Sequence, residues 1–330
     1  MERKTLKFDT EFAKWREPFG SKLRVPRFET TDDFREYSDR FMGAAMRSIP
    51  PEPSIIRTKY TCVSHDGAEI EIERHATAEQ MAPQETPQPA VLFFHGGGMV
   101  VGSIELFARS TSARVAESGV QFFAVEYRLA PEYPDPTPVE DCYAAVKWLS
   151  AHGAELGVDS SRLAVMGDSA GGGLAAGTSL LARDRGLEPP IKKQILVYPM
   201  LDDRSTNAPS AAALDEFVYF PLHTSRVCWE AYLGKERAGK DDADVSPYAA
   251  PGRATNLRGL PSTYIDVGGL DLFSEECALF AARLVAASVQ VEFHLFPGLT
   301  HGFEGATEVP NVKLAVAGRM RWIKDLLSAE

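Results

Sequence analysis

The sequence predicts an α/β protein with a mostly parallel central sheet flanked by helices. Short, nearly continuous apolar runs recur along the chain, at residues 90–94, 120–125, 163–166, 194–198 and 263–267. Strands that are covered by helices on both faces have this composition, whereas half-exposed strands alternate apolar and polar residues. Helical or irregular stretches separate the runs, and this alternation is typical of a doubly wound parallel sheet.

Helical patterns account for most of the stretches between these strands. We expect helices at residues 138–152, 169–185, 274–287 and 311–328. Ser274 is the predicted N-cap of the third helix, because a serine side chain can accept a hydrogen bond from a free backbone N–H group. Gly186 is the predicted stop of the second helix, because glycine tolerates the left-handed conformation in which helices often end.

A last strand is predicted at residues 289–295 and differs from the others. Its apolar residues alternate with polar ones: Val289, Val291, Phe293 and Leu295 are separated by Gln290, Glu292 and His294. A period of two indicates a strand with one face in solvent. We therefore expect it at an edge of the sheet.

The first 90 residues show a different organisation. A helix is expected from the spacing of Phe34, Tyr37, Phe41 and Ala45, with Thr31 as its cap. Two strands are expected around residues 55–63 and 68–74, joined by a turn at 65–67. Residues 78–89 are polar and proline-rich, which predicts a solvated loop.

The chain is expected to form one domain over residues 1–330. Residues 203–250 interrupt the strand–helix order and are too many for an ordinary connection. Together with residues 1–50 they are interpreted as a cap over the sheet. The catalytic core then comprises residues 51–202 and 251–330.

Composition excludes several classes of partner. The net charge of -11 disfavours binding to nucleic acid or to anionic membranes, whose phosphates would repel the chain. No apolar run approaches the about 18 residues needed to span a membrane. The charged N-terminus has no apolar core of a secretion signal, so we expect a cytoplasmic protein.

The four cysteines give no indication of a metal site. They lie far apart, at positions 62, 142, 228 and 277, with no Cys-x-x-Cys pair. Zinc ribbons and dense disulfide frameworks are therefore excluded, and no metal is expected. Three of the cysteines lie in predicted helices, where the expected role is that of a small buried apolar residue.

The first chemical motif directly follows the strand at residues 163–166. It reads Gly167-Asp168-Ser169-Ala170-Gly171 and opens the next predicted helix. This pattern, in this strand-to-helix context, is the nucleophile elbow of the α/β-hydrolase fold. Ser169 is the predicted nucleophile, on a turn where the two glycines leave room for close backbone packing.

A second motif ends the strand at residues 90–94. It reads His95-Gly96-Gly97-Gly98 and matches the loop that supplies oxyanion donors in lipases and esterases. Fixed backbone N–H groups stabilise the negative charge that develops when an ester carbonyl is attacked. We expect the N–H groups of Gly97, Gly98 and Ala170 to form this hole, with His95, Gly96 and Asp168 supporting the two motifs.

The base and the acid follow from chain order, because this fold arranges its triad as serine, acid, histidine. Of the histidines after Ser169, His223 lies in the predicted cap and His294 on a solvated strand face, whereas His301 lies on a loop after the last strand. His301 is therefore the predicted base.

Asp271 is the predicted acid, because it follows the strand at 263–267. Asp266 is the main alternative, but it lies inside that strand and is expected to face a helix layer. Asp202 and Asp203, after the preceding strand, are weaker alternatives.

Several blocks, taken together, resemble the hormone-sensitive lipase family of esterases over residues 85–328. They are HGGG at 95–98, YRLAPE at 127–132, GDSAGGG at 167–173, YPM at 198–200, GLD at 269–271 and HGF at 301–303. The family's acid is often followed by Pro-Leu and then Asp-Glu, whereas Asp271 precedes Leu272, Phe273, Ser274 and Glu275. Arg128 and Glu132 are expected to brace their loop rather than to bind substrate.

The resemblance implies an α/β-hydrolase core with a helical cap and hydrolysis of carboxylic esters with short or medium acyl chains. It also implies that no cofactor is needed, and homodimers are common in the family. Cleavage of lactones or amides by the same triad is the closest alternative, and a non-catalytic small-molecule receptor is a more distant one. The cap aromatics that are candidates for the substrate pocket are Phe19, Phe217, Tyr219, Phe220 and Trp229.

Overall fold

A computed structural model describes residues 6–23, 26–83, 85–218 and 220–328. Within them, one sheet has the strand order β1-β2-β4-β3-β5-β6-β7-β8. Its strands are β1 Ile55–Val63, β2 Glu69–Thr77, β3 Gln88–Phe94, β4 Gln121–Val125, β5 Val158–Asp168, β6 Lys193–Val197, β7 Ser262–Gly268 and β8 Val291–Phe296. The predicted mostly parallel sheet is confirmed.

The two strand pairings at one end of the sheet are antiparallel, and all others are parallel. Strand β2 pairs antiparallel with both β1 and β4, whereas β4, β3, β5, β6, β7 and β8 run in one direction. The central strands are buried over most of their length, as their apolar runs predict. Parallel strands also bring their carboxyl ends, and the loops that follow, to one edge of the sheet.

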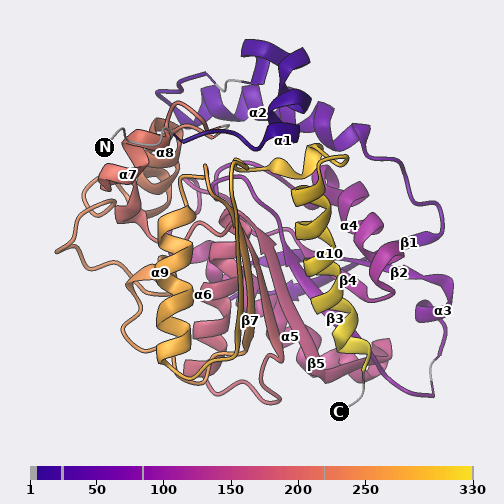
Figure 1. Cartoon of the computed structure of the whole chain (residues 1–330). Coiled ribbons are helices and arrows are strands. Elements are labelled where there is room, and N and C mark those ends of the chain that lie inside the picture. The colour runs from indigo at the N-terminus through magenta and orange to yellow at the C-terminus, as the bar shows by residue number, and fades with distance from the viewer. Residues whose placement is uncertain (1–5, 24–25, 84, 219, 329–330) are drawn as a thin grey trace.

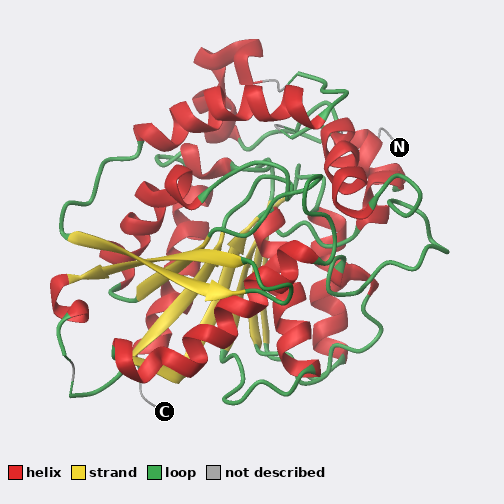
Figure 2. Ribbon diagram, turned by 180° about the vertical axis from the view of Figure 1, so that it is seen from behind, coloured by secondary structure: helices red, strands yellow, loops and turns green. Residues whose placement is uncertain are grey.

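Helices cover both faces of the sheet. They are α1 Thr10–Arg16, α2 Thr31–Ser48, α3 Ala78–Met81, α4 Ile104–Ser118, α5 Thr137–His152, α6 Ala170–Asp184, α7 Pro209–Leu214, α8 Leu222–Leu233, α9 Ser274–Ala286 and α10 Pro310–Lys324. Helices α6 and α9 lie on one face and α4 and α10 on the other (Figure 1), and α5 packs against α6. Figure 2 shows the twisted strands enclosed between these layers.

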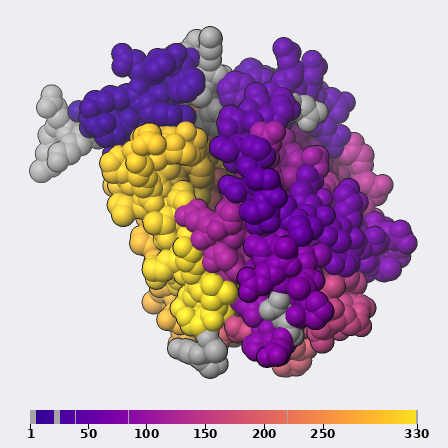
Figure 3. All heavy atoms as spheres, turned by 90° about the vertical axis from the view of Figure 1, so that its right-hand side faces the viewer, coloured from indigo at the N-terminus to yellow at the C-terminus, as the bar shows by residue number. Residues whose placement is uncertain are grey.

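Helices α1 and α2 of residues 1–50 and helices α7 and α8 of residues 203–250 lie together beyond the carboxyl ends of the parallel strands (Figure 1), whereas Tyr248 lies alongside α6. Helix α2 contacts α8 of the second segment and α4 of the sheet layer. Asp9 donates its backbone N–H to the carbonyl of Gly298, after β8, and accepts a hydrogen bond from Asn311 at 3.1 Å. The N-terminal segment is therefore seated on the C-terminal part of the chain, as Figure 3 shows.

Two predicted helix caps were wrong by one residue. Thr30, not Thr31, caps α2, because its hydroxyl accepts a hydrogen bond from the N–H of Asp33 at 3.2 Å. Ser274 is the first residue of α9, and the cap position belongs to Phe273, which makes no side-chain capping bond. Gly186 does follow the end of α6, with φ of 65°.

The segment predicted as a solvated loop at 78–89 contains a short helix, α3. Thr77 and Gln80 form a capping box at its start, in which each side chain accepts a hydrogen bond from the other residue's backbone N–H. Helix α4 was not predicted. Its buried face includes the hydroxyl residues Thr111, Ser112 and Ser118, so the apolar periodicity that reveals a helix is weak there.

Strand β8 lies at the sheet edge, as predicted, but its alternation does not separate a buried from a solvated face. Every side chain from Val291 to Phe296 is partly or fully exposed, and Leu295 is 48% exposed although its pattern predicted burial.

The cysteines agree with the prediction, since all four are free and buried.

Candidate active site

Ser169 lies on the turn between β5 and α6, where the elbow motif predicts it. Its φ of 59° falls in the left-handed region, which an L-residue adopts only when the surrounding structure holds it there. A Cβ atom on Gly171 would lie 2.0 Å from the carbonyl oxygen of Phe94, so only glycine lets α6 approach β3 this closely. Ser169 itself is 9% exposed.

The three predicted triad residues form one chain of hydrogen bonds. His301 Nε2 lies 2.9 Å from Ser169 Oγ, and His301 Nδ1 lies 2.7 Å from Asp271 Oδ2. The other carboxylate oxygen of Asp271 accepts a hydrogen bond from the N–H of Phe273 at 3.0 Å. Both carboxylate oxygens of Asp271 are therefore hydrogen-bonded within the protein. The residue is 1% exposed, so the carboxylate is also shielded from water. The arrangement can remove a proton from the serine hydroxyl.

The competing acids are engaged elsewhere. Asp266 lies on β7 and faces α10, where Arg319 holds both of its carboxylate oxygens. Asp202 binds Arg204, and Asp203 binds Arg253 and the N–H of Gly239. None of these carboxylates contacts His301 in the described hydrogen bonds, and the expectation that Asp266 faces a helix layer is correct.

The competing histidines also lie away from Ser169. His294 pairs with Glu292 on the exposed edge strand, at 2.7 Å. His223 is in α8 and lies 3.4 Å from Glu29. Of these three histidines, only His301 lies within hydrogen-bond distance of Ser169, the predicted nucleophile.

Three aromatic rings surround the imidazole of His301. The ring centroid of Tyr198 lies 4.5 Å from that of His301, Phe273 lies at 5.2 Å edge-on, and Phe220 lies at 5.8 Å. Phe220 belongs to the 203–250 segment, whereas Tyr198 follows β6. From the sequence, Tyr198 was named only as part of the Tyr-Pro-Met block at residues 198–200, and its contact with His301 was not predicted. A tripeptide carries no signal for which distant side chain its tyrosine ring will contact.

The glycine loop at residues 95–98, which is predicted to supply the oxyanion donors, lies against the elbow. A Cβ atom on Gly96 would lie 3.3 Å from Cβ of Ser169 and 3.0 Å from the carbonyl oxygen of Asp168. Gly97 has φ of 126°, a conformation that L side chains rarely adopt, and a side chain there would collide with the carbonyl of Val101. The glycines thus permit a backbone path beside Ser169 that other residues would block.

His95 shapes this loop from inside the protein. Its ring is stacked between Phe107 and Tyr127, and its Nδ1 lies 2.8 Å from the carbonyl oxygen of Gly96. The Tyr127 hydroxyl donates to the carbonyl of His95 at 2.7 Å. Burial lowers the pKa of His95 to about 4, so the ring is neutral near pH 7. Its position is that of a structural residue of the loop.

The remaining predicted support residues are held by ion pairs. Asp168 accepts a hydrogen bond from Arg114 of α4 at 2.6 Å. Arg128 binds Asp141 and Asp66 through its guanidinium, so its bracing role is correct.

Glu132 is bound by Arg35 of α2, which lowers the pKa of that carboxyl to about 2. Arg35 also donates to the carbonyls of Val100 and Ala130, so α2 is bonded directly to the segment that follows the glycine loop and to the segment after β4.

Only one of the described candidate pocket aromatics contacts the triad. Phe220 lies next to His301, and its ring also meets Phe34 of α2 and Phe273. By contrast, Phe217 packs on Phe8, Phe19 is exposed beside Trp15, and Trp229 is buried beside Tyr232. Tyr219 lies outside the described residues.

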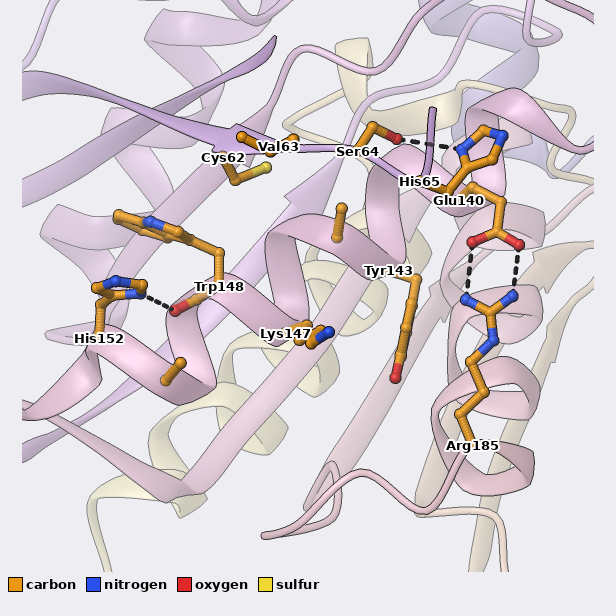
Figure 4. Close-up of a pocket in the computed structure, with 12 residues that line it drawn as sticks. Cys62, Val63, Ser64, His65, Glu140, Tyr143, Lys147, Trp148, His152 and Arg185 are labelled. Carbon is orange, nitrogen blue, oxygen red and sulfur yellow. Dashed lines mark hydrogen bonds and ion pairs between the residues drawn. The ribbon is translucent and has the colours of Figure 1, made fainter. Parts of the chain in front are cut away.

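A separate surface pocket of about 400 Å³ lies between β1 and α5. Figure 4 shows its lining, which includes Val63, His65, Lys147, Trp148 and His152. No triad residue lines it, so this pocket is distinct from the site around Ser169.

The described part of the chain shows neither a metal site nor a membrane-spanning helix. It contains no group of three His, Cys, Asp or Glu side chains arranged to hold a metal ion. None of its helices combines the length and apolar character needed to cross a membrane.

Comparison with known proteins agrees with this geometry. A family model described as alpha/beta hydrolase fold matches residues 91–305. Esterase LipI of Mycobacterium tuberculosis is 36% identical over 81% of this chain and 83% of its own length, and an ethyl acetate hydrolase of Pseudomonas putida is 32% identical over 86% of each. The solved structure of a bacterial heroin esterase superposes with a TM-score of 0.87 at 35% identity, covering 98% of this chain and 99% of the other. The chain therefore belongs to the hormone-sensitive lipase-like family of α/β-hydrolase-fold proteins.

Proposed function

We propose that this protein is a serine carboxylic ester hydrolase that works through an acyl-enzyme on Ser169. The observation that carries the proposal is the hydrogen-bonded chain from Ser169 through His301 to Asp271, on an elbow that lies against the glycine loop. The relatives named above are an esterase, an ethyl acetate hydrolase and a heroin esterase, which supports ester cleavage over the amide, lactone and receptor alternatives.

In the first half of the reaction, Ser169 Oγ attacks the ester carbonyl while His301 Nε2 takes its proton. Asp271 accepts the N–H of His301 Nδ1, which keeps the lone pair of Nε2 directed at the serine and stabilises the imidazolium that forms. The carbonyl oxygen becomes an oxyanion, which we assign to the N–H groups of Gly97, Gly98 and Ala170. Collapse of this intermediate expels the alcohol, which receives its proton from His301.

In the second half, a water molecule attacks the acyl-enzyme. His301 accepts a proton from the water and then returns it to Ser169 Oγ as the carboxylic acid leaves. The same oxyanion donors serve both halves, because both pass through a tetrahedral intermediate at the same carbon. No step requires a cofactor.

The substrates we propose are small esters with short- to medium-chain acyl groups. We assign residues 1–50 and 203–250 to a cap and residues 51–202 and 251–330 to the catalytic core. Phe220 supports this division, because a residue of the 203–250 segment stands beside the base and encloses the site. Assembly as a homodimer and a cytoplasmic location stay predictions from the sequence.

The test is replacement of the nucleophile. We expect Ser169→Ala to fold normally and to lose hydrolysis of p-nitrophenyl acetate and butyrate, because the hydroxyl is needed for the covalent step. Mass spectrometry after treatment of the unsubstituted protein with a phosphonofluoridate should find the adduct on Ser169. More than a trace of turnover in the folded variant, or an adduct on another residue, would contradict the assignment.

A further inference from the structure

The carbonyl group of Gly97 determines the direction of one proposed oxyanion donor, the N–H of Gly98. A peptide bond is planar and trans, so an N–H group points away from the carbonyl that precedes it. The Gly97 carbonyl accepts hydrogen bonds from the N–H groups of Val100 and Val101, each at 3.0 Å. The turn at residues 97–101 therefore fixes the orientation of the Gly97–Gly98 peptide and of the donor that belongs to it.

This turn has a backbone conformation that the surrounding structure must hold. Three successive residues have positive φ, with values of 126° at Gly97, 62° at Gly98 and 60° at Met99. Met99 is not glycine, and such residues persist in this region only where their surroundings over-determine them. Met99 and Val100 are also completely buried, so their carbonyl groups need hydrogen-bond partners inside the protein.

Arg35 of α2 supplies one of these partners and holds the other in place. Its Nε donates to the carbonyl of Val100 at 3.0 Å. Its Nη2 donates to the carbonyl of Ala130 at 2.8 Å, and the N–H of Ala130 donates in turn to the carbonyl of Met99 at 2.9 Å. Both carbonyls are therefore bonded either to Arg35 or to a residue that Arg35 binds.

Glu132 keeps the guanidinium of Arg35 in the orientation that these bonds require. Its two carboxylate oxygens accept hydrogen bonds from the two Nη atoms of Arg35, each at 2.6 Å. A bidentate pair of this kind fixes the plane of the guanidinium, which the single ammonium group of a lysine cannot reproduce. The Glu132 side chain is 53% exposed, so we expect the pair to contribute orientation more than stability.

The part of α2 that carries Arg35 also lies close to the proposed base. Phe34, the preceding residue, is buried, and its ring centroid lies 5.9 Å from that of Phe220. Phe220 in turn contacts His301. Helix α8 touches the glycine loop itself, because a side chain on Gly98 would collide with the thiol of Cys228. Elements assigned to the cap thus contact both the glycine loop and the segment that follows it.

We propose that Arg35 is a positioning residue for the oxyanion hole. By holding the turn at residues 97–101, it keeps the N–H of Gly98 directed at the oxygen that becomes negatively charged. A residue of the segment that we assign to the cap then helps to build the catalytic site as well as to enclose it. This inference rests on the proposed ester hydrolysis and adds a residue that neither the triad nor the glycine motif contains.

The first test is Arg35→Met, which keeps the aliphatic part of the side chain and removes its hydrogen bonds. Loss of a whole oxyanion donor lowers kcat by about 10²–10³. A donor that is present but less well aligned should cost less, so we expect kcat for p-nitrophenyl butyrate to fall about tenfold with KM within about twofold. A kcat within twofold of that of the unsubstituted enzyme, or a change confined to KM, overturns the proposal.

Inhibition by a trifluoromethyl ketone tests whether the effect passes through the oxyanion hole. This compound forms a hemiketal with the nucleophilic serine, and its oxyanion resembles that of the tetrahedral intermediate. The inhibition constant should rise in Arg35→Met by about the factor by which kcat/KM falls. An unchanged inhibition constant beside a reduced kcat overturns the proposed route. Active-site titration and thermal unfolding restrict the comparison to folded enzyme.

Arg35→Lys separates the charge of the side chain from its set of hydrogen bonds. The ammonium group can still pair with Glu132, but it lacks the planar fork that bonds Glu132 and both carbonyls together. We expect Arg35→Lys to retain most of the loss in kcat that Arg35→Met shows. Full activity in Arg35→Lys overturns the proposal, because positive charge alone would then be sufficient.

Arg109→Met is the matched control. Arg109 of α4 binds the other end of α2, where it donates to the carbonyls of Arg47 and Ile49 at 2.6 and 3.0 Å. Its replacement removes the same charge and loosens the same helix at a position away from the glycine loop, so kcat should stay within twofold. A fall equal to that of Arg35→Met overturns the specific role of Arg35, because the general seating of α2 would then be the cause.

Ser169→Ala separates this inference from the proposed function. Retained ester hydrolysis in folded Ser169→Ala refutes the proposed function itself. An inactive Ser169→Ala together with a normal Arg35→Met refutes only the positioning role of Arg35.

Discussion

Replacement of Asp271 by asparagine tests the triad most directly, because the structure determines how the new amide must lie. One carboxylate oxygen of Asp271 accepts the N–H of Phe273 at 3.0 Å, and the other lies 2.7 Å from His301 Nδ1. In Asp271→Asn the amide oxygen keeps the bond to Phe273, since an NH2 group there would face another donor. The NH2 group is therefore directed at His301 Nδ1.

This orientation imposes the wrong tautomer on the base. With an amide donor beside it, Nδ1 must act as an acceptor, so the proton of the neutral imidazole moves to Nε2. Nε2 then cannot take the proton of Ser169 Oγ, from which it is 2.9 Å away. Loss of the productive tautomer lowers kcat by about four orders of magnitude in a comparable triad, which corresponds to about 5.4 kcal/mol in activation free energy.

The assay is the steady-state hydrolysis of p-nitrophenyl butyrate, with Asp266→Asn as the control. Asp266 is buried and paired with Arg319, so its replacement should act mainly on stability, by about 3–5 kcal/mol for a broken buried pair. The folded fraction of Asp266→Asn should keep kcat within about tenfold of the unsubstituted enzyme, because Asp266 bonds to Arg319 and not to His301. An active Asp271→Asn beside an inactive, folded Asp266→Asn would refute the reasoning.

The remaining predictions concern the proposed cap and the glycine loop at residues 95–98. Phe220→Ala should raise KM and shift the preferred acyl length while the rate of Ser169 phosphonylation changes little, because the ring encloses the site without taking part in proton transfer. Trp229→Ala, at a buried position away from the triad, should mainly lower the unfolding temperature. Collapse of labelling in Phe220→Ala would mean that this ring also helps to build the catalytic site. Burial lowers the pKa of His95 from its ordinary 6.5 to about 4, so the unfolded chain binds this proton more readily and the free energy of unfolding should fall as the pH drops from 6.5 toward 4. The denaturant midpoint measures this, and an unchanged pH slope in a folded His95→Asn variant would count against it.

Local patterns were sufficient for the sheet and for the main residues of the candidate site. The buried strands are recognisable because helices cover both of their faces, which leaves continuous apolar runs in the sequence. Ser169 is recognisable because the elbow requires glycines at fixed spacing, and His301 and Asp271 follow from the order that this fold imposes on its triad. These features depend on residues close in sequence or on one known topology.

Local sequence patterns did not predict features that depend on the exact start of a helix or on contacts with other elements. The start of α9 was misassigned because the carbonyl of Phe273 already accepts the first helical hydrogen bond, from the N–H of Cys277 at 3.0 Å, so Ser274 lies inside the helix and not at its cap. Helix α4 was missed because its buried face carries hydroxyl groups, such as that of Ser112, which bonds to His75 of β2. Exposure of Leu295 on the edge strand likewise could not be inferred from its alternating pattern.

The surroundings of the base were decided by the tertiary structure alone. The sequence by itself determined the fold class, the elbow, the glycine loop and the three residues of the predicted triad. Arg319 lies 5.5 Å from the ring of Tyr198 and binds Glu304 because the sheet order places β6 beside β7 and α10 packs on β7. Phe220, rather than Phe217 or Trp229, contacts His301 because its segment folds back over the strand ends. Contacts between residues this far apart depend on the packing of whole elements, for which no short stretch of sequence carries a signal.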